Sequence, residues 1–332
     1  TMEIMKKVAD KHDLVCLLHE KPFEGINGSG KHNNWSMITD DGVNLLDPGK
    51  TPSENIQFLV FLMAVIKAVD EYADLLRISV ASAGNDHRLG ANEAPPAVVS
   101  IFLGDELTEV LKSIENDTYF TSHGAVQMDI GAIVLPHFVK DNTDRNRTSP
   151  FAFTGNKFEF RMLGSAASVA NPNIVLNTAV AEALDQFAKE LDGVAPEDME
   201  HAVHELIKRA IKKHKRVIFN GNGYTDEWIE EAEKRGLYNL KSTPDALPMW
   251  IAQKNIDLFT KHSIFTSEEL HSRYEIWLEN YSKTINIESN TMVEMVQKDL
   301  LPSVMSYIEE IASTASLKAS VVPGITCESE TA

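Results

Sequence analysis

The spacing of apolar side chains predicts several elements in the first part of the chain. Residues 2–13 repeat apolar positions at helical spacing, the apolar segment 14–22 predicts a short strand, and residues 31–38 alternate like a second strand. The Gly-rich segment between the last two is therefore expected to be a loop that connects two strands.

The longest helical pattern covers residues 51–80. It opens with Thr-Pro-Ser, which is typical of a helix start, and it contains the nine-residue apolar run 58–66. A membrane-spanning helix needs about 20 residues of this kind. We therefore expect a long buried helix and no membrane segment.

Two later segments combine breaks in the pattern with charged side chains. Residues 82–98 are dense in Gly, Asn and Pro and predict a loop, but they carry His87, Arg88 and Glu93. Charged residues on a loop between rigid elements indicate a functional site. Residues 133–165 predict a strand, a polar loop and a last strand.

The last of these strands has two distinct faces. Apolar side chains occupy every second position from Phe158 to Met162, and the opposite face carries Lys157, Glu159 and Arg161. This alternation predicts one face in the core and one face available for chemistry.

The chain beyond Asn171 is expected to be mostly helical. With 332 residues, the length is sufficient for one large domain plus an appendage. The periodicity predicts helices at 171–191, 198–215, 226–235, 245–261, 267–282 and 291–315.

Charge excludes several classes of partner. The formal net charge is −18, with 43% hydrophobic and 24% charged residues, so a general electrostatic attraction to nucleic acid or anionic lipid is not expected. Any anionic ligand must be held by a local basic cluster.

The basic segment 208–216 falls at a predicted helix C-terminus, where cations complement the helix dipole. We interpret it as a solvated helix end.

Cysteine and histidine spacing matches no disulfide or zinc motif. Cys16 and Cys327 stand in unrelated contexts without C-x-x-C spacing, which makes the cytoplasm the default location. His201 and His204 lie three residues apart on a predicted helix, but the residue order in HAVHE differs from that of the helical zinc motifs.

The segment GINGSGKHNNWS at 25–36 raises the question of a phosphate-binding P-loop. Gly25, Gly30 and Lys31 satisfy most of the pattern, but a P-loop needs Ser or Thr after the lysine and a helix directly behind it. His32 occupies that position, and a strand follows. The P-loop interpretation is therefore rejected, which leaves His32 as either a metal ligand or a structural histidine.

The longer segment KPFEGINGSGKHNNWS resembles the ATP-binding signature of glutamine synthetases along its entire length, and its GKHNNWS part resembles their type III class. Two further segments follow in the family's order. RLGANEAP at 88–95 is similar to the glutamate-binding and flap segment, and NKFEFR at 156–161 is similar to the late metal-binding strand. The resemblance implies an α+β fold, in which part of the glutamine synthetase catalytic domain (an antiparallel sheet with helices) precedes a helical C-terminal region.

The resemblance also implies metal and substrate roles. His32 and Glu159 would be ligands of the divalent cation on the ATP phosphates, Mg²⁺ or Mn²⁺. Asn27 and Gly28 would contact the glutamate substrate, and Arg88 would pair with its α-carboxylate through the guanidinium fork.

The nucleotide and the transferred phosphoryl group would have their own partners. Arg147 and Arg161 would stabilise charge on the phosphoryl group. The residues implied to lie beside the nucleotide or its phosphates are Asn34, Ser36 and Lys157.

The chain departs from the better-known classes at two places. Glu93 matches the flap glutamate that takes a proton from ammonium, but it follows Arg88 by five residues where those classes have six. Ala152 stands where they place another phosphate-facing arginine, and Arg145 is a candidate substitute.

The extent of the resemblance suggests a part of a longer protein. Residues 1–285 would be the later part of the catalytic domain, and 286–332 would begin the type III C-terminal helical extension. The family's N-terminal β-rich domain and its early catalytic glutamates have no counterpart in the sequence. We therefore expect a fragment that is inactive or poorly active alone, from a parent that assembles as stacked hexameric rings.

The implied activity is the ligation of ammonia to L-glutamate with ATP, through a γ-glutamyl phosphate. The partners would be L-glutamate, ammonium and ATP, without nucleic acid or membrane. Two alternatives remain open. One is a ligase that joins glutamate to another amine, and the other is a non-catalytic fragment that binds glutamate or nucleotide and associates with a complete synthetase.

Overall fold

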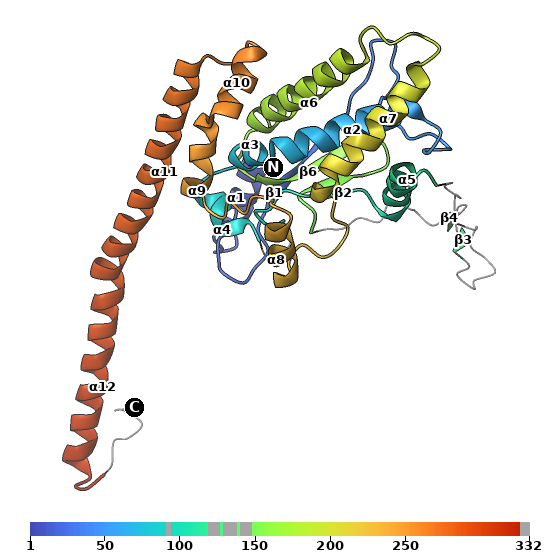
Figure 1. Ribbon diagram of the computed structural model, residues 1–332. Helices are drawn as coiled ribbons and strands as arrows, with labels where there is room; N and C mark the ends of the chain where they lie inside the picture. The colour runs from blue at the N-terminus through green and yellow to red at the C-terminus, as the bar shows by residue number, and fades with distance from the viewer. Residues whose placement is uncertain (91–93, 119–126, 129–137, 140–147, 326–332) are drawn as a thin grey trace. The chain divides into compact units, whose positions relative to one another are not determined.

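The computed structural model describes residues 1–90, 94–118, 127–128, 138–139 and 148–325 (Figure 1). The chain divides into two compact units, Thr1–Trp277 and Leu278–Ala332, which are described separately. The division into domains at residue 285 that the resemblance implies stays a prediction.

A small sheet organises the first unit. Its strand order is β1 (Gly30–Trp35), β6 (Phe158–Gly164), β5 (Phe151–Phe153) and β2 (Ile101–Phe102). Neighbours pair antiparallel except β5 and β2, which are parallel. A separate antiparallel pair consists of β3 (Gln127–Met128) and β4 (Phe138–Val139). The predicted α+β fold is confirmed, and the sheet is mixed at its β2 edge.

The core forms where the apolar face of the β5–β6 hairpin meets helix α2 (Ile56–Glu71). The rings of Phe151 and Phe158 stack with centroids 4.8 Å apart, and Phe153 meets Phe158 edge-on at 5.2 Å. Phe58 of α2 reaches Phe153 at 6.0 Å. Aromatic pairs at these distances add to the free energy of burial, so the alternation predicted for the last strand is confirmed on its apolar face.

Helices surround this core, and α2 packs against α6 and α7 (Figure 1). The described helical segments that lie wholly in the first unit are, besides α2, α1 (Met2–Asp10), α3 (Ala73–Ile78), α4 (Ala83–Arg88), α5 (Asp105–Glu115), α6 (Ala170–Leu191), α7 (Met199–His214), α8 (Asp226–Lys234), α9 (Thr243–Ala246) and α10 (Gln253–Lys261), with the 3-10 turns η1 (Lys215–Val217) and η2 (Leu247–Ile251).

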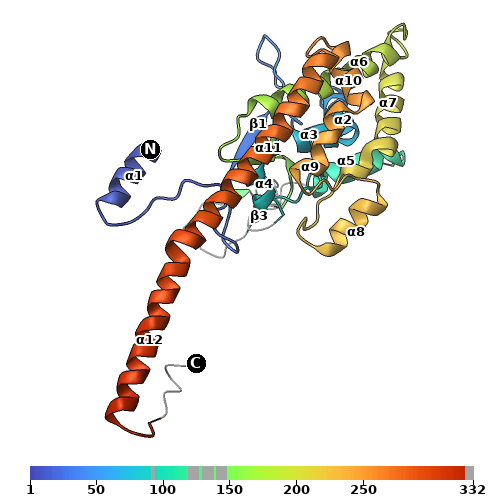
Figure 2. The same ribbon diagram turned by 90° about the vertical axis from the view of Figure 1, so that its left-hand side faces the viewer.

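Two predictions in the first 80 residues were wrong. Residues 14–22 form no strand; they run as an extended connection between α1 and β1, and Leu14 and Val15 are exposed (Figure 2). A strand needs a hydrogen-bonded neighbour, and no described strand pairs with this segment. The single helix expected over 51–80 is two helices, because the backbone leaves helical geometry at Tyr72, and α2 is capped by Asn55 instead of the Thr-Pro-Ser turn.

The loop predicted for 82–98 contains a short helix. The Ser82 side chain accepts a hydrogen bond from the Asn85 backbone N–H and so caps α4, in spite of the surrounding breakers. The helix predicted at 245–261 is broken into α9, η2 and α10, while the helices at 171–191, 198–215 and 226–235 are confirmed within one or two residues at each end.

The second unit is helical. Helix α11 (Ser267–Met295) begins in the first unit and continues into the second, where the π-helical turn η3 (Val296–Leu300) leads into α12 (Leu301–Val321). The two helices predicted at 267–282 and 291–315 are thus joined without a gap. None of the described helices is both long and apolar enough to cross a membrane.

The phenylalanine cluster should carry a large share of the stability of the first unit. Phe160→Ala removes a fully buried ring and is expected to lower the free energy of unfolding by about 3–5 kcal/mol. Phe23→Ala, at a ring that is 61% exposed, should change it by less than about 0.5 kcal/mol. Urea unfolding followed by circular dichroism measures both. Equal effects of the two substitutions would contradict the assigned core.

Candidate active site

The pairing of β1 with β6 brings two predicted metal ligands together. Asn34 lies opposite Glu159, and the register shifts between Lys31 and Asn33, so His32 sits at a bulge. Its Nδ1 lies 3.6 Å from Glu159 Oε2, with the two side chains 55% and 11% exposed. Bulges redirect a side chain at the edge of a sheet, and here the bulge lies at the histidine beside the carboxylate.

Arg161 shares the charged face of β6 with Glu159. Its Nε and Nη2 donate hydrogen bonds to Glu159 Oε2 at 3.2 and 3.0 Å. The guanidinium is buried, and so is most of the carboxylate. The Glu159 oxygen that faces His32 is thus also held by the guanidinium of Arg161.

Ala152 occupies the position across from Glu159 on β5. The resemblance described above implies that the better-known classes of the family carry a phosphate-facing arginine at this position. The side chain is fully buried, and the cation that contacts Glu159 comes from Arg161 on the same strand. Arg145, the suggested substitute, lies outside the described residues.

The donor set fits part of a coordination shell for a hard divalent cation. One imidazole nitrogen and one carboxylate oxygen face each other, and Mg²⁺ or Mn²⁺ takes about six ligands, several of them commonly water or phosphate oxygens. Within the described ranges, no group of three or more His, Cys, Asp or Glu side chains could hold a metal ion. His32 and Glu159 can therefore contribute two ligands, and the remaining ligands of a bound cation would have to come from other groups.

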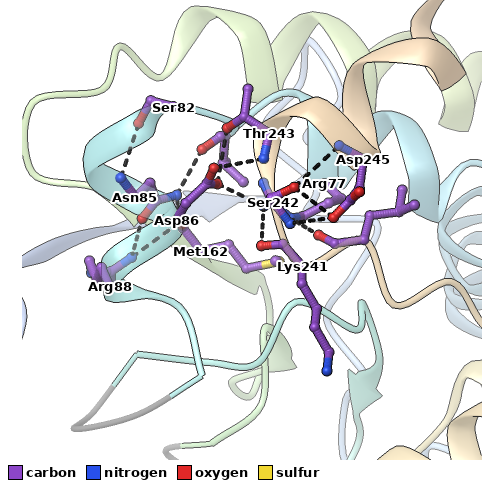
Figure 3. Close-up of polar contacts among 12 residues, drawn as sticks. Arg77, Ser82, Asn85, Asp86, Arg88, Met162, Lys241, Ser242, Thr243 and Asp245 are labelled. Carbon is purple, nitrogen blue, oxygen red and sulfur yellow. Dashed lines mark hydrogen bonds and ion pairs between the residues drawn. The ribbon is translucent and has the colours of Figure 1, made fainter. Parts of the chain in front are cut away.

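Arg88 is buried at the end of α4, directly beside β6 (Figure 3). Its Nη1 donates to Asn85 Oδ1 at 3.2 Å and to the Met162 carbonyl at 3.1 Å, and its Nη2 donates to the Arg161 carbonyl at 3.3 Å. Its buried Nε has no hydrogen-bond partner among the described residues. Burial lowers the pKa of Arg88, and the charge of Glu20 opposes that shift.

The Gly-rich loop packs on this arginine. A Cβ atom at Gly28 would lie 2.8 Å from Arg88 Cγ, and one at Gly30 would lie 2.0 Å from Arg88 Nη2 and 2.8 Å from the Leu163 carbonyl. Glycine is required at both positions because the backbone and the guanidinium approach so closely. Two residues predicted to hold glutamate, Gly28 and Arg88, are thus in contact, and Asn27 is exposed on the same loop.

Glu20 is a residue of this site that the sequence analysis missed. Its backbone carbonyl accepts from Ser29 N at 2.8 Å, and its Oε1 accepts from Ala166 N at 2.7 Å. A Cβ at Gly164 would lie 2.3 Å from the same oxygen, so the carboxylate fits only beside glycine. Glu20 therefore connects the loop to the end of β6. The only signal in the sequence was a charged residue near the end of the apolar segment 14–22.

A second buried network holds α4 from its other side (Figure 3). Arg77 Nη2 donates to Asp86 Oδ1 at 3.0 Å, and its Nε donates to the Leu240 carbonyl at 2.8 Å. Asp86 Oδ2 accepts from Thr243 N at 2.7 Å. Burial lowers the pKa of Arg77, and the hydrogen bond to Asp86 opposes the shift. The helix that carries Arg88 is thereby fixed to α3 and to the start of α9.

The residues expected beside the nucleotide lie at the other end of the β1–β6 pair. Ser36 Oγ donates to Asn44 Oδ1 at 2.8 Å and to the Asn156 carbonyl at 3.0 Å. Lys157 follows Asn156 in the turn before β6, and Asn34 Nδ2 donates to the His32 carbonyl at 3.2 Å. These side chains are grouped on one edge of the sheet, while Glu93 and Arg147 lie outside the described residues.

Comparison with known proteins identifies the class of protein that carries this arrangement. Residues 1–99 match the family model of the glutamine synthetase catalytic domain, and residues 202–318 match that of the glutamine synthetase C-terminal domain. The chain therefore belongs to the glutamine synthetase family.

Individual relatives are similar to almost the whole chain. A glutamine synthetase of Butyrivibrio fibrisolvens is 58% identical over 99% of this chain and 47% of its own length. A type-3 glutamine synthetase of Dictyostelium discoideum is 52% identical over 98% of this chain and 44% of its own length. A solved structure described as "Apo GmaS without ligand" covers 86% of this chain and 48% of its own, with 16% identity and a TM-score of 0.44. The chain spans about half the length of the curated relatives it matches.

The close approach of the loop to Arg88 can be tested by adding one methyl group. Gly30→Ala should displace the guanidinium or the loop and lower the free energy of unfolding by about 1–3 kcal/mol. Ser29→Ala, at the exposed neighbouring position, should leave stability nearly unchanged. Thermal unfolding of the two variants checks this. A Gly30→Ala variant as stable as Ser29→Ala would mean that the loop does not lie on Arg88.

Proposed function

We propose that the protein to which these residues belong joins ammonia to L-glutamate with ATP, giving L-glutamine, ADP and phosphate. The observation that carries the proposal is the meeting of three separate sequence segments around β6. His32 Nδ1 on β1 lies 3.6 Å from Glu159 Oε2 on β6. Gly28, in the loop that leads into β1, packs on Arg88, which lies beside the C-terminal end of β6. Membership of the glutamine synthetase family supports the same activity.

The proposed reaction has two steps. The γ-carboxylate oxygen of glutamate attacks the γ-phosphorus of ATP, the bond to ADP breaks, and an acyl phosphate forms. Ammonia then attacks the acyl carbon, and the C–O bond to phosphate breaks as the amide forms. Activation as a mixed anhydride supplies a good leaving group, since direct displacement of an oxide from a carboxylate is unfavourable.

The chain's own residues would bind and orient the reactants. We assign glutamate to Asn27, Gly28 and Arg88, whose buried guanidinium is already fixed by backbone carbonyls. The nucleotide would lie against Asn34, Ser36 and Lys157.

Charge and protons complete the assignment. His32 and Glu159 would hold Mg²⁺ or Mn²⁺, which neutralises phosphate charge when bound. Arg147 and Arg161 would stabilise the phosphoryl group in transfer, and Glu93 would accept the proton of ammonium.

Assembly and location are part of the proposal. We expect the complete protein to form stacked hexameric rings in the cytoplasm, without nucleic acid or membrane as a partner. The intact mass of the native gene product separates this from a free-standing binding fragment. A mass well above 36.9 kDa supports a complete ligase, whereas 36.9 kDa favours a non-catalytic protein that binds glutamate or nucleotide.

The metal assignment predicts a specific loss of cation affinity. His32→Ala and Glu159→Gln should each weaken Mn²⁺ binding at least about tenfold, because each removes one direct donor. Titration of Mn²⁺ followed by electron paramagnetic resonance gives the dissociation constants. The matched control is His201→Ala, which replaces a histidine on α7 and should bind Mn²⁺ like the unsubstituted chain. If both histidine variants behave alike, His32 is not a ligand.

The choice of amine tests the reaction itself. The complete protein should form glutamine and release phosphate only with glutamate, ATP and ammonium present together. Replacing ammonium by methylamine or ethylamine should reduce the rate of phosphate release by at least about tenfold, since a pocket built for a small cation rejects the larger amine. Faster release with an alkylamine would show a glutamate ligase for another amine, and binding without release would show a sensor.

A further inference from the structure

A basic cavity lies away from the site described above. It has a volume of about 440 Å³ and is formed by the C-terminal halves of α5 and α7 together with residues 215–218 and Arg235. Of its lining residues, six are Lys or Arg and one is Glu. The apolar side chains of Leu111, Ile211 and Ile218 also line it. Such a concentration of cations contrasts with a chain whose formal net charge is −18.

Four of the six cations are already paired with carboxylates. Lys215 Nζ contacts both oxygens of Glu115 at 2.7 and 2.9 Å, and Arg216 Nε donates to Asp70 Oδ1 at 2.7 Å. Lys213 and Arg235 pair with Glu71 and Glu231. These contacts fix the walls of the cavity and use only part of the donor capacity of the two arginines.

The remaining donors have no protein acceptor in the described part of the chain. The ammonium groups of Lys112 and Lys212 make no hydrogen bond or ion pair there, and Nη2 of Arg216 and of Arg235 donates to no described atom. The nearby carboxylate of Asp117 pairs with Lys208 instead of Lys212. Two ammonium groups without a hydrogen bond or ion pair, and the Nη2 groups of two arginines, thus line one cavity.

The position of the cavity separates it from the proposed catalytic residues. Ile218 bridges to Ile101 of β2, and Phe219 N donates to the Ile101 carbonyl at 2.8 Å. Strand β2 is the sheet edge opposite to β1, with β6 and β5 between them. A ligand in this cavity would therefore lie across the sheet from His32.

The helix dipole explains only part of this arrangement. Lys112 and Lys212 lie in the last turns of α5 and α7, where cations are favourable, as the sequence of 208–216 predicts. A dipole contribution requires no cavity and no apolar lining. Cationic donors around a concave apolar surface are instead the features of a site for an organic anion.

We propose that this cavity binds a small organic anion with at least two negative charges, on phosphate or carboxylate oxygens, and an apolar part that lies against Leu111 and Ile211. The proposal is independent of the ligase function. Lysines suit phosphate as point charges and arginines suit planar carboxylates, so the cavity offers donors to either group.

Calorimetric titration of the chain in metal-free buffer of low ionic strength tests the proposal, since the nucleotide site is expected to need a divalent cation. The probes are phenyl phosphate, benzene-1,3-dicarboxylate and inorganic phosphate. The test variant is Lys112→Gln with Lys212→Gln, and the control is Lys50→Gln with Lys189→Gln, which removes the same charge at exposed positions elsewhere. Circular dichroism confirms that each variant is folded.

We expect at least one aromatic anion to bind more tightly than inorganic phosphate, and the test variant to lose at least about tenfold in affinity while the control keeps it. The tighter of the two aromatic probes identifies the charged group. Equal affinity of the test and control variants, or no binding of either aromatic anion to the unsubstituted chain, overturns the proposal.

As a second readout, the bound anion should protect Lys112 and Lys212, but not Lys50, from acetylation measured by mass spectrometry. Equal acetylation of the three lysines with and without the anion also overturns the proposal.

Discussion

The antiparallel pairing of β1 with β6 is the interaction on which the candidate site depends. Side chains alternate between faces along a strand, so a slip of one residue would send His32 and Glu159 to opposite faces of the sheet. A shift of β6 by one residue is opposed by its own phenylalanines, because it would also turn the fully buried rings of Phe158 and Phe160 out of the core. The position of Glu159, a proposed metal ligand, is therefore fixed by the core on the far side of the same strand.

Buried charge is the second constraint, and it links the loop to the sheet. Burying a guanidinium is unfavourable unless its donors are satisfied. Arg88 meets this requirement at Nη1 and Nη2, which donate to the backbone carbonyls of Met162 and Arg161, so its position follows from the position of β6. Its Nε has no hydrogen-bond partner among the described residues. Glu20 provides the opposite charge nearby and is held by the Ala166 N–H. The glycines of the loop are then required by the space that Arg88 occupies.

The sequence allowed the prediction of elements whose signal is local. Helical spacing located α6, α7 and α8, alternation located β1 and β6, and the motifs indicated that His32 and Glu159 belong together. The strand predicted at 14–22 was wrong because strand formation depends on a partner that local alternation does not reveal. Glu20 was missed for a similar reason. Its role comes from Ala166 and Gly164, which are far away in sequence and which no spacing rule connects to it.

The described residues offer two proposed metal ligands, His32 and Glu159, and this number has a consequence for where the remaining ligands would lie. A hard divalent cation held by one imidazole and one carboxylate would be bound weakly, because most of its shell would be water. Tight binding would then require further oxygens, and under the proposed function the phosphates of ATP are one source. Under the proposed function, nucleotide and cation would therefore strengthen each other's binding. By linkage, each would raise the affinity of the other by the same factor, so His32 and Glu159 would influence ATP affinity without a direct contact to the nucleotide.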